Sequence, residues 1–222
     1  SNTLINDQNG VEEDDSVYKI GSGSALSRHS ESDQMRLYES GMDSGFPGKS
    51  DETNKSFTFC FWVQLNTLDV NQDIFSKTHP VIEEDGSSNR QYIFSVTTGN
   101  YMELNISANG LNYNRLNHSQ TVQAGIWYHV GVTYDNSDYS ARIRIWDDTA
   151  GAILGMDATG ILSDMYMTDY SYFRISWNSP LFALDGNIDE FVVFNRILSV
   201  SEIDQIRQGT FGSGAPTPGF TV

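Results

Sequence analysis

The most constraining feature of this sequence is a succession of short segments in which polar and apolar residues alternate, with Gly, Asn, Asp and Ser between them. A period of two is typical of β-strands that bury one face, and these segments are rich in β-branched and aromatic residues. Asn109-Gly110 is one of several turn signals between them. Eleven segments fit the pattern: 17–20, 34–38, 57–65, 73–76, 92–97, 102–108, 111–116, 127–134, 141–146, 172–177 and 186–194.

A helix is expected only late in the chain, over residues 199–208. Ser199 is suited to cap it, Glu202 stands three residues later as in a capping box, and Gly209 is suited to end it. Ile203 and Ile206 supply an apolar contact, so we expect the helix to pack on an edge of the sheets. Many short strands with one late helix predict an all-β fold, an antiparallel β-sandwich.

The acidic residues are unevenly placed along the chain. Of 29 Asp and Glu, five lie in residues 1–16, which precede every Lys and Arg and are expected to form an acidic flexible lead. The remainder has 24 acidic and 13 basic residues, a net charge of −11, so the acidity also belongs to the domain expected at 17–210. Residues 211–222 carry Gly and Pro but no charge, which is typical of a linker or tail. We therefore expect flanking domains in a larger polypeptide.

Composition excludes several partners. The net charge of −16 repels phosphate groups, which argues against nucleic acid and against anionic membranes. No apolar run approaches the ~20 residues of a membrane span, so no membrane insertion is expected. The single cysteine, Cys60, excludes an intrachain disulfide and a cysteine-based zinc site, and its aromatic neighbours predict a small core residue.

Three segments, in this order, resemble the laminin-G-like, concanavalin A-like jelly-roll superfamily of lectins and glucanases. Residues 56–63 (SFTFCFWV) are similar to its "FTxxxWV" strand, and residues 125–135 (GIWYHVGVTYD) to its "xWxHVAxTYD" strand. Residues 184–199 (LDGNIDEFVVFNRILS) resemble "FxGxIDEVRIYNRALS". Residues 143–148 (IRIWDD) depart from the family's "xLYxNG" turn. The resemblance implies a jelly roll over about residues 25–210.

Glucanases of this superfamily carry a Glu-x-Asp-x-(x)-Glu strand, whose carboxylates act as acid and nucleophile. The segment that begins at Glu202 starts in this way but lacks the closing Glu, and no other stretch supplies the triplet. His129 lies in an expected strand, where the resemblance implies a structural role, and His29, His79 and His118 are expected in exposed loops. We identify no catalytic residue and expect a protein that is not an enzyme.

The resemblance implies a metal role for one residue, Asp189. In many such jelly rolls the Asp of the terminal "IDE"-like strand helps to bind a structural Ca²⁺, and backbone carbonyls near the first strand complete the shell. Here those carbonyls would come from residues 21–24 or 30–33. Glu190 is adjacent and points to the opposite face of a regular strand, so it is not expected to share the ion. The alternative is that backbone N–H groups or an arginine satisfy Asp189 without metal.

Carbohydrate binding requires aromatic platforms beside side chains that form hydrogen bonds, because sugars present apolar C–H faces rimmed by hydroxyls. The candidates are Tyr113 with Asn112, and Tyr166 and Tyr170 with Trp177. The alternative for each aromatic residue is core or edge packing.

These observations favour a non-catalytic, extracellular carbohydrate-binding or adhesion module, stabilised by Ca²⁺ and displayed on a cell or virion surface. Its partner would be a glycan or a surface protein. An alternative is a structural or assembly module of a phage or viral fibre, capsid or surface appendage that binds protein subunits. A glycan-cleaving enzyme is the third hypothesis.

Overall fold

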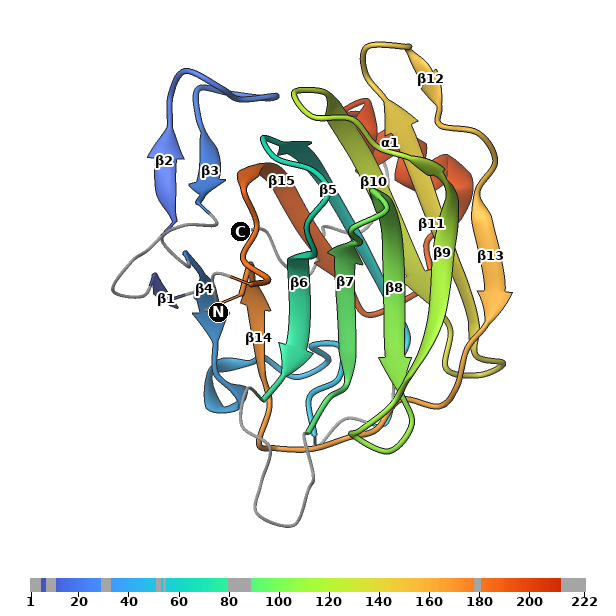
Figure 1. Ribbon diagram of the computed structural model, residues 1–222. Helices are drawn as coiled ribbons and strands as arrows, with labels where there is room; N and C mark the ends of the chain where they lie inside the picture. The colour runs from blue at the N-terminus through green and yellow to red at the C-terminus, as the bar shows by residue number, and fades with distance from the viewer. Residues whose placement is uncertain are drawn as a thin grey trace.

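Two antiparallel sheets pack face to face in the computed structural model, which describes residues 5–6, 11–28, 33–50, 53, 55–79, 89–177 and 181–212 (Figure 1). In these ranges seven strands form the front sheet of Figure 1, in the order β1 (Ile5–Asn6), β4 (Met35–Leu37), β14 (Tyr172–Ile175), β6 (Gln72–Thr78), β7 (Tyr92–Val96), β8 (Tyr101–Ser107) and β9 (Tyr113–Thr121). The back sheet has the order β12 (Ala152–Ile153), β11 (Ser140–Asp147), β10 (Trp127–Tyr134), β5 (Phe57–Leu65), β15 (Gly186–Phe194), β3 (Ser24–Ser27) and β2 (Glu12–Asp14), and β13 (Ala158–Ile161) pairs with β11. A short 3-10 helix, η2, spans Glu39–Gly41.

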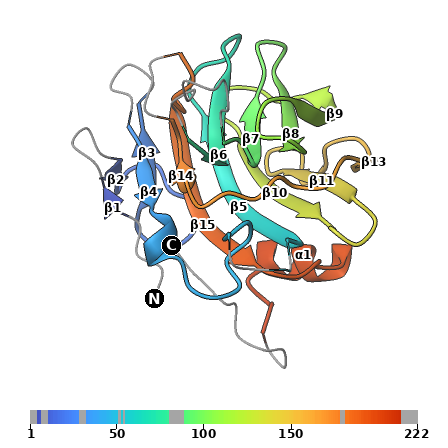
Figure 2. The ribbon, with the colours of Figure 1, turned by 90° about the horizontal axis from the view of Figure 1, so that it is seen from below.

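The core lies between the two sheets, as the view from below shows (Figure 2). Inward residues of both sheets are aromatic or aliphatic because alternate side chains of each strand point to the interior. Phe75 of the front sheet lies 4.4 Å from Phe59 of the back sheet and 5.4 Å from Phe94, measured between ring centroids. The predicted antiparallel sandwich is confirmed.

The three segments that carried the family resemblance lie side by side at the centre of the back sheet. β5 pairs with β10 on one side and with β15 on the other. Gly186 begins β15 at a point where only glycine fits, since a Cβ there would stand 2.1 Å from the backbone oxygen of Gln64. The glycine of the third segment therefore permits β15 to approach β5.

The helix α1 (Val200–Arg207) begins with the predicted capping box. Ser199 Oγ accepts the N–H of Glu202, and the Glu202 carboxylate accepts the N–H of Ser199. Ile203 is buried against Gly131 of β10, where a Cβ would stand 2.6 Å from the Ile203 side chain. The helix thus covers the outer surface of the back sheet rather than its edge (Figure 2). It is too short to cross a membrane, and none of the described residues forms a helix long and apolar enough to do so.

The first strands differ from those expected from the sequence. Residues 12–14, expected within the flexible lead, form β2 and pair with β3, and the Asp14 carboxylate accepts a hydrogen bond from the Asn187 amide of β15 at 3.1 Å. Residues 17–20 were predicted as a strand but form no ladder, because the N–H groups of Lys19 and Ile20 donate to the Asp189 side chain. Residues 213–222 of the expected tail lie outside the described residues.

Candidate functional site

The outward surface of the front sheet carries two rows of mostly polar side chains. The register of the strands aligns one outward residue from each of six strands, and we call this the arginine row: Arg36, Arg174, Ser76, Ile93, Asn105 and Arg115. A second row runs parallel to it and consists of Asp73, Ser95, Glu103 and Asn117. The two rows with the neighbouring Tyr172, Thr78, Ser107, Tyr113 and Trp177 are called the polar face.

Much of the polar face is buried, although the outward surface of a sandwich commonly faces water. Ser76 and Ser107 are fully buried, and the hydroxyls of four residues have no hydrogen-bond partner in the described part of the chain. These are Ser76, Thr78, Ser107 and Tyr113. Leaving such a group unpaired costs about 1–3 kcal/mol.

Arg174 stands on β14, between Arg36 and Ser76 in the arginine row, and is completely buried. Its guanidinium carbon is 4.4 Å from the ring centroid of Tyr172 and 3.9 Å from that of Trp177. Nη2 donates to the Thr78 carbonyl at 3.0 Å, whereas Nε and Nη1 have no acceptor among the described residues. Burial lowers the pKa of Arg174 to about 10, which still leaves the guanidinium charged at neutral pH.

The second row contains two carboxyl groups, those of Asp73 and Glu103, and Asp73 interacts electrostatically with Arg174. Asp73 and Glu103 are 7% and 6% exposed and stand two strands apart, on either side of Ser95. Burial raises the pKa of Asp73 to about 7; the positive charge of Arg174 opposes this rise and Glu103 adds to it. The polar face therefore holds a carboxyl group that titrates near neutral pH.

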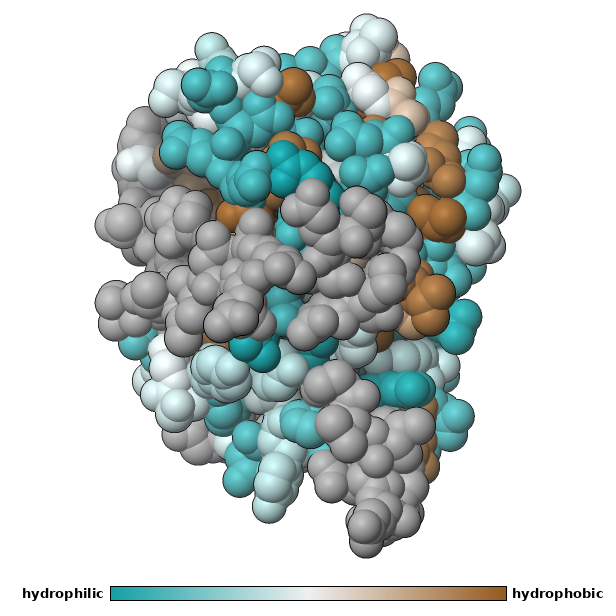
Figure 3. Space-filling view, turned by 60° about the vertical axis from the view of Figure 1, so that its left-hand side comes forward, coloured by the Kyte–Doolittle hydropathy of each residue, from teal (hydrophilic) through white to brown (hydrophobic). Residues whose placement is uncertain are grey.

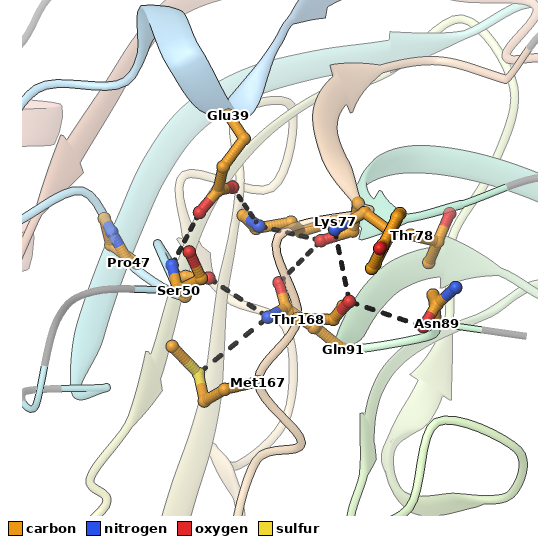
Figure 4. A network of polar contacts seen from close by, with 12 residues as sticks. Glu39, Pro47, Ser50, Lys77, Thr78, Asn89, Gln91, Met167 and Thr168 are labelled. Carbon is orange, nitrogen blue, oxygen red and sulfur yellow. Dashed lines mark hydrogen bonds and ion pairs between the residues drawn. The ribbon is translucent and has the colours of Figure 1, made fainter.

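A polar network inside the sandwich fixes the end of β6 that borders this face (Figure 4). Lys77 Nζ donates to Glu39 Oε2 and to Ser171 Oγ, both at 2.8 Å, and Ser171 Oγ donates to the Gln91 side chain at 3.1 Å. Burial lowers the pKa of Lys77 to about 8, an effect that the Glu39 carboxylate partly offsets. The network fixes Lys77 inward, so Ser76 and Thr78 on either side of it point outward.

Two of the five predicted ligand residues lie on the polar face. Tyr113 of β9 points outward and has Arg90 5.5 Å from its ring centroid. Trp177 follows β14 and packs on Arg174. Burial raises the pKa of the Tyr113 hydroxyl, which has no partner among the described residues.

The other three candidates lie nearer the β8–β9 turn or away from the face. Tyr166 packs on Gly110 in this turn, and its N–H donates to the Ser107 carbonyl at 2.7 Å. Asn112 is exposed in the same turn, and the Tyr170 side chain is largely exposed. The structure therefore does not bring Tyr170 and Trp177 together in one site.

Arg174 was not identified as a candidate residue from the sequence. The alternation in residues 172–177 places Arg174 on the same side as Tyr172, and a charged residue in the middle of a strand is the signal that could have identified it. Asp73 was included in a predicted strand without a functional role. Its proximity to Arg174 depends on the pairing of β6 with β14, which are distant in sequence.

Asp189 does not have the surroundings that Ca²⁺ requires. Oδ2 accepts the backbone N–H groups of Lys19 and Ile20 at 2.9 and 2.8 Å, and Oδ1 accepts that of Glu190 at 2.8 Å. Calcium is bound by 6–8 oxygen atoms, whereas donors surround this carboxylate. Across the described ranges, no three His, Cys, Asp or Glu residues gather as a metal site. Residues 30–32 of the second expected carbonyl set lie outside the described residues. The geometry matches the metal-free alternative.

A cavity of about 500 Å³ opens beside Asp189, between β2–β3 and the edge formed by β4, β14 and β15. A β-bulge in β15 gives Glu190 a φ of 49°, so Asp189 and Glu190 line the same cavity rather than opposite faces. Ile175 and Phe191 contribute apolar lining. Among the residues that Figure 3 colours on the side of the molecule that carries these strands, hydrophilic ones predominate, and hydrophobic ones lie mainly toward the right-hand margin.

The histidines and the cysteine show no nucleophilic arrangement in the described part of the chain. His129 is buried beside Trp62, and burial together with Arg207 and Arg144 lowers its pKa to about 3. His118, expected in an exposed loop, lies in β9 and is buried, because its side chain points inward. Burial raises the pKa of Cys60 and keeps it a neutral thiol.

The two packed antiparallel sheets define a jelly-roll protein. The chain belongs to the concanavalin A-like lectin/glucanases superfamily, whose family model matches residues 40–204. The resemblance inferred from the three sequence segments is therefore confirmed. None of the curated proteins matches this sequence at a significant level.

Several solved structures share this fold at low sequence identity. Full-length tailspike protein 2 of the Escherichia coli O157:H7 bacteriophage CAB120 has a TM-score of 0.54 and is 10% identical; the match covers 89% of this chain and 25% of that one. Domain 4 of AbnA, an extracellular arabinanase from Geobacillus stearothermophilus, has a TM-score of 0.50 and 15% identity, over 88% of this chain and 80% of that one. A putative carbohydrate binding protein from Bacteroides ovatus is 18% identical, with a TM-score of 0.49 over 73% and 42% of the two chains. This chain spans about a quarter of the tailspike protein, and at these identities the likeness shows the fold alone.

Proposed function

We propose that this chain is a non-catalytic carbohydrate-binding module of an extracellular or surface-displayed protein, and that the polar face is its ligand surface. The observation that carries the proposal is the concanavalin A-like jelly roll matched over residues 40–204, an architecture shared by an arabinanase domain in complex with arabinotriose. The polar face adds the exposed side chains of Arg115 and Asn117 to one surface of the sandwich.

The accessible groups of the polar face support recognition through hydrogen bonds and ring contacts. Asn117 provides an exposed amide, Arg115 an exposed guanidinium, and Tyr113 and Trp177 provide half-buried rings on the same face. Saccharide hydroxyls act as both donors and acceptors, so they can satisfy such a mixture. The arabinanase domain of similar fold is in complex with arabinotriose, which supports this use of the architecture. We expect an affinity of about millimolar to micromolar, as is usual for few contacts.

A glycan-cleaving enzyme is a second candidate, favoured by one observation. Asp73 and Glu103 are two carboxyl groups on one face, and the pKa of Asp73 is raised to about 7, which suits a general acid. Strands two positions apart have backbones about 10 Å from each other, which is comparable with the about 6.5–9.5 Å that separates the carboxyl groups of an inverting pair. Incubation of the protein with polysaccharides, followed by a reducing-end assay, tests this candidate. Hydrolysis that is lost in both Asp73→Asn and Glu103→Gln would replace the binding proposal.

A glycan array tests the binding proposal directly. We expect the wild type to bind one class of glycan, Arg115→Gln, at an exposed position of the polar face, to lose that binding, and Arg196→Gln to retain it. Arg196 is a suitable control because it follows β15 of the back sheet, away from the polar face, and its substitution removes the same charge. Absence of binding to every glycan, with and without a chelator, would refute the proposal. Self-association in that case would support the structural or assembly module instead.

A further inference from the structure

The cavity of about 500 Å³ beside Asp189 brings a carboxylate to the inner side of the back sheet. Residues that are directly opposite in an antiparallel ladder point to the same face, and the register aligns Glu13 with Ala25 and Ala25 with Ile188. Ile188 belongs to the core between the sheets, so Glu13 also points to the inner face. Glu13 is nevertheless exposed, and the cavity is therefore open to solvent at this residue.

Two backbone features let carboxylates from β2 and β15 reach this cavity. Gly23 leaves room for the Glu13 side chain, because a Cβ at position 23 would stand 2.9 Å from Glu13 Oε1 and 3.2 Å from its Cγ. The bulge in β15 turns Glu190 toward the same space. Glu13 and Glu190, which are distant in the sequence, thus line one cavity.

Every charged residue described along the cavity wall is acidic: Glu12, Glu13, Asp189 and Glu190. Two of these carboxylates have partners, since Glu12 accepts Arg28 Nη2 at 2.7 Å and Asp189 accepts three backbone N–H groups. The carboxylates of Glu13 and Glu190 form no hydrogen bond or ion pair within the described ranges. A cavity lined by one sign of charge attracts the opposite sign, so this one favours a cation.

The cavity also has an apolar wall, which an inorganic ion would not use. Met35 and Ala25 are half-buried, and Ile175, Ile188 and Phe191 lie deeper. Contact with such a wall favours an apolar ligand surface by about 25 cal/mol per Å² removed from water. A volume of about 500 Å³ is within the range of small-molecule sites. The charge and the wall together fit a cation that has an apolar body.

We propose that this cavity binds a small organic amine, whose ammonium group pairs with Glu13 and Glu190 while its apolar body contacts Met35 and Ala25. A hydrogen bond between an ammonium group and a carboxylate is stronger than one between neutral groups. The net charge of −16 also favours the approach of a cation. The site does not depend on the proposed carbohydrate-binding function, because the cavity lies between the sheets and the polar face lies on the outer surface of the front sheet.

Phenethylamine is a suitable probe, because it combines an ammonium group with an apolar ring. NMR titration of the isotope-labelled protein compares it with phenethyl alcohol, which is neutral, and with phenylacetate, which is an anion. We expect phenethylamine to shift the amide signals of Ala25 and Ile188 and to bind about tenfold more tightly than the alcohol, whereas phenylacetate should not bind. Glu13→Gln and Glu190→Gln should each weaken binding of the amine, and Asp15→Asn should leave it unchanged, since Asp15 is exposed and lies outside the cavity wall.

Three results would overturn this inference. Equal binding of the amine and the alcohol, or unchanged binding in both Glu variants, would remove the role of the carboxylates. Amide shifts confined to residues outside the cavity, or no binding of phenethylamine, would remove the site. Displacement of the amine by an equal concentration of Ca²⁺ would assign these carboxylates to a metal ion instead. The glycan array is a separate test, whose failure would refute the carbohydrate-binding function and leave the amine site in place.

Discussion

The carboxyl group of Asp73 should make the stability of this protein depend on pH near neutrality, where most carboxyl groups do not titrate. Asp73 is 7% exposed, and burial raises its pKa from the ordinary value of 3.8 to about 7. The folded state therefore holds a proton on this group at pH values where the unfolded chain has lost it. Stability from this group is complete below about pH 4 and is lost as the pH rises through 7.

The size of the effect follows from the two pKa values. A difference of about three corresponds to about 4 kcal/mol in the free energy of unfolding. Between pH 5 and pH 8 the contribution of Asp73 should change by about 2–3 kcal/mol. Asp73→Asn keeps the shape and removes the titration, so the variant should gain this amount relative to the wild type over the same interval.

Urea unfolding at pH 5, 6, 7 and 8 measures this difference. Asp15→Asn serves as the matched control, because Asp15 is exposed and its substitution changes the net charge equally. The reasoning is refuted if the curves for the wild type and Asp73→Asn remain parallel across this range. Such a result would mean that water reaches the Asp73 carboxyl group in the folded protein.

Three further predictions follow from other contacts. Gly186→Ala should lower stability by about 3 kcal/mol in urea unfolding, since its Cβ would meet the Gln64 carbonyl; an unchanged midpoint would contradict this packing. His129→Gln should retain stability between pH 7 and 4 where the wild type loses about 3 kcal/mol, because burial lowers the pKa of His129 to about 3 and folding excludes its proton. A chelator should leave the melting temperature unchanged, since backbone N–H groups occupy the Asp189 carboxylate; a marked fall would restore Ca²⁺ there.

The fold was predictable because the alternation of polar and apolar residues that marks each strand is local in the sequence and recurs along the chain. The alternation in residues 57–65 and 127–134 marks the strands β5 and β10 with the same bounds that the structure shows. The prediction failed where a local pattern competed with a tertiary contact. Residues 17–20 alternate like a strand, but the Asp189 carboxylate accepts two of their N–H groups, and the bulge that redirects Glu190 has no clear local signal.

The candidate site was predictable only in part, because it depends on strand order. Tyr113 and Trp177 were identified from their residue type and both reached the polar face. Arg174, Ser76 and Asp73 become neighbours through the pairing of β14 with β6, across almost a hundred residues of sequence. Alternation determines which side of a strand a residue occupies, but not which strand lies beside it.

The net charge of the chain and the charge of its polar face lead to opposite expectations about anions. The value of −16 argues against long polyanions such as nucleic acid, which would contact much of the surface at once. A single sugar carboxylate is affected mainly by charges within the Debye length, about 8 Å at physiological salt. Around Arg174 these nearby charges are the positive charges of the arginine row and the negative charge of Asp73. Asp73 loses its negative charge as the pH falls through 7. The acidity of the whole chain therefore argues against polyanions, whereas the local charge near Arg174 depends on pH through the Asp73 carboxyl group.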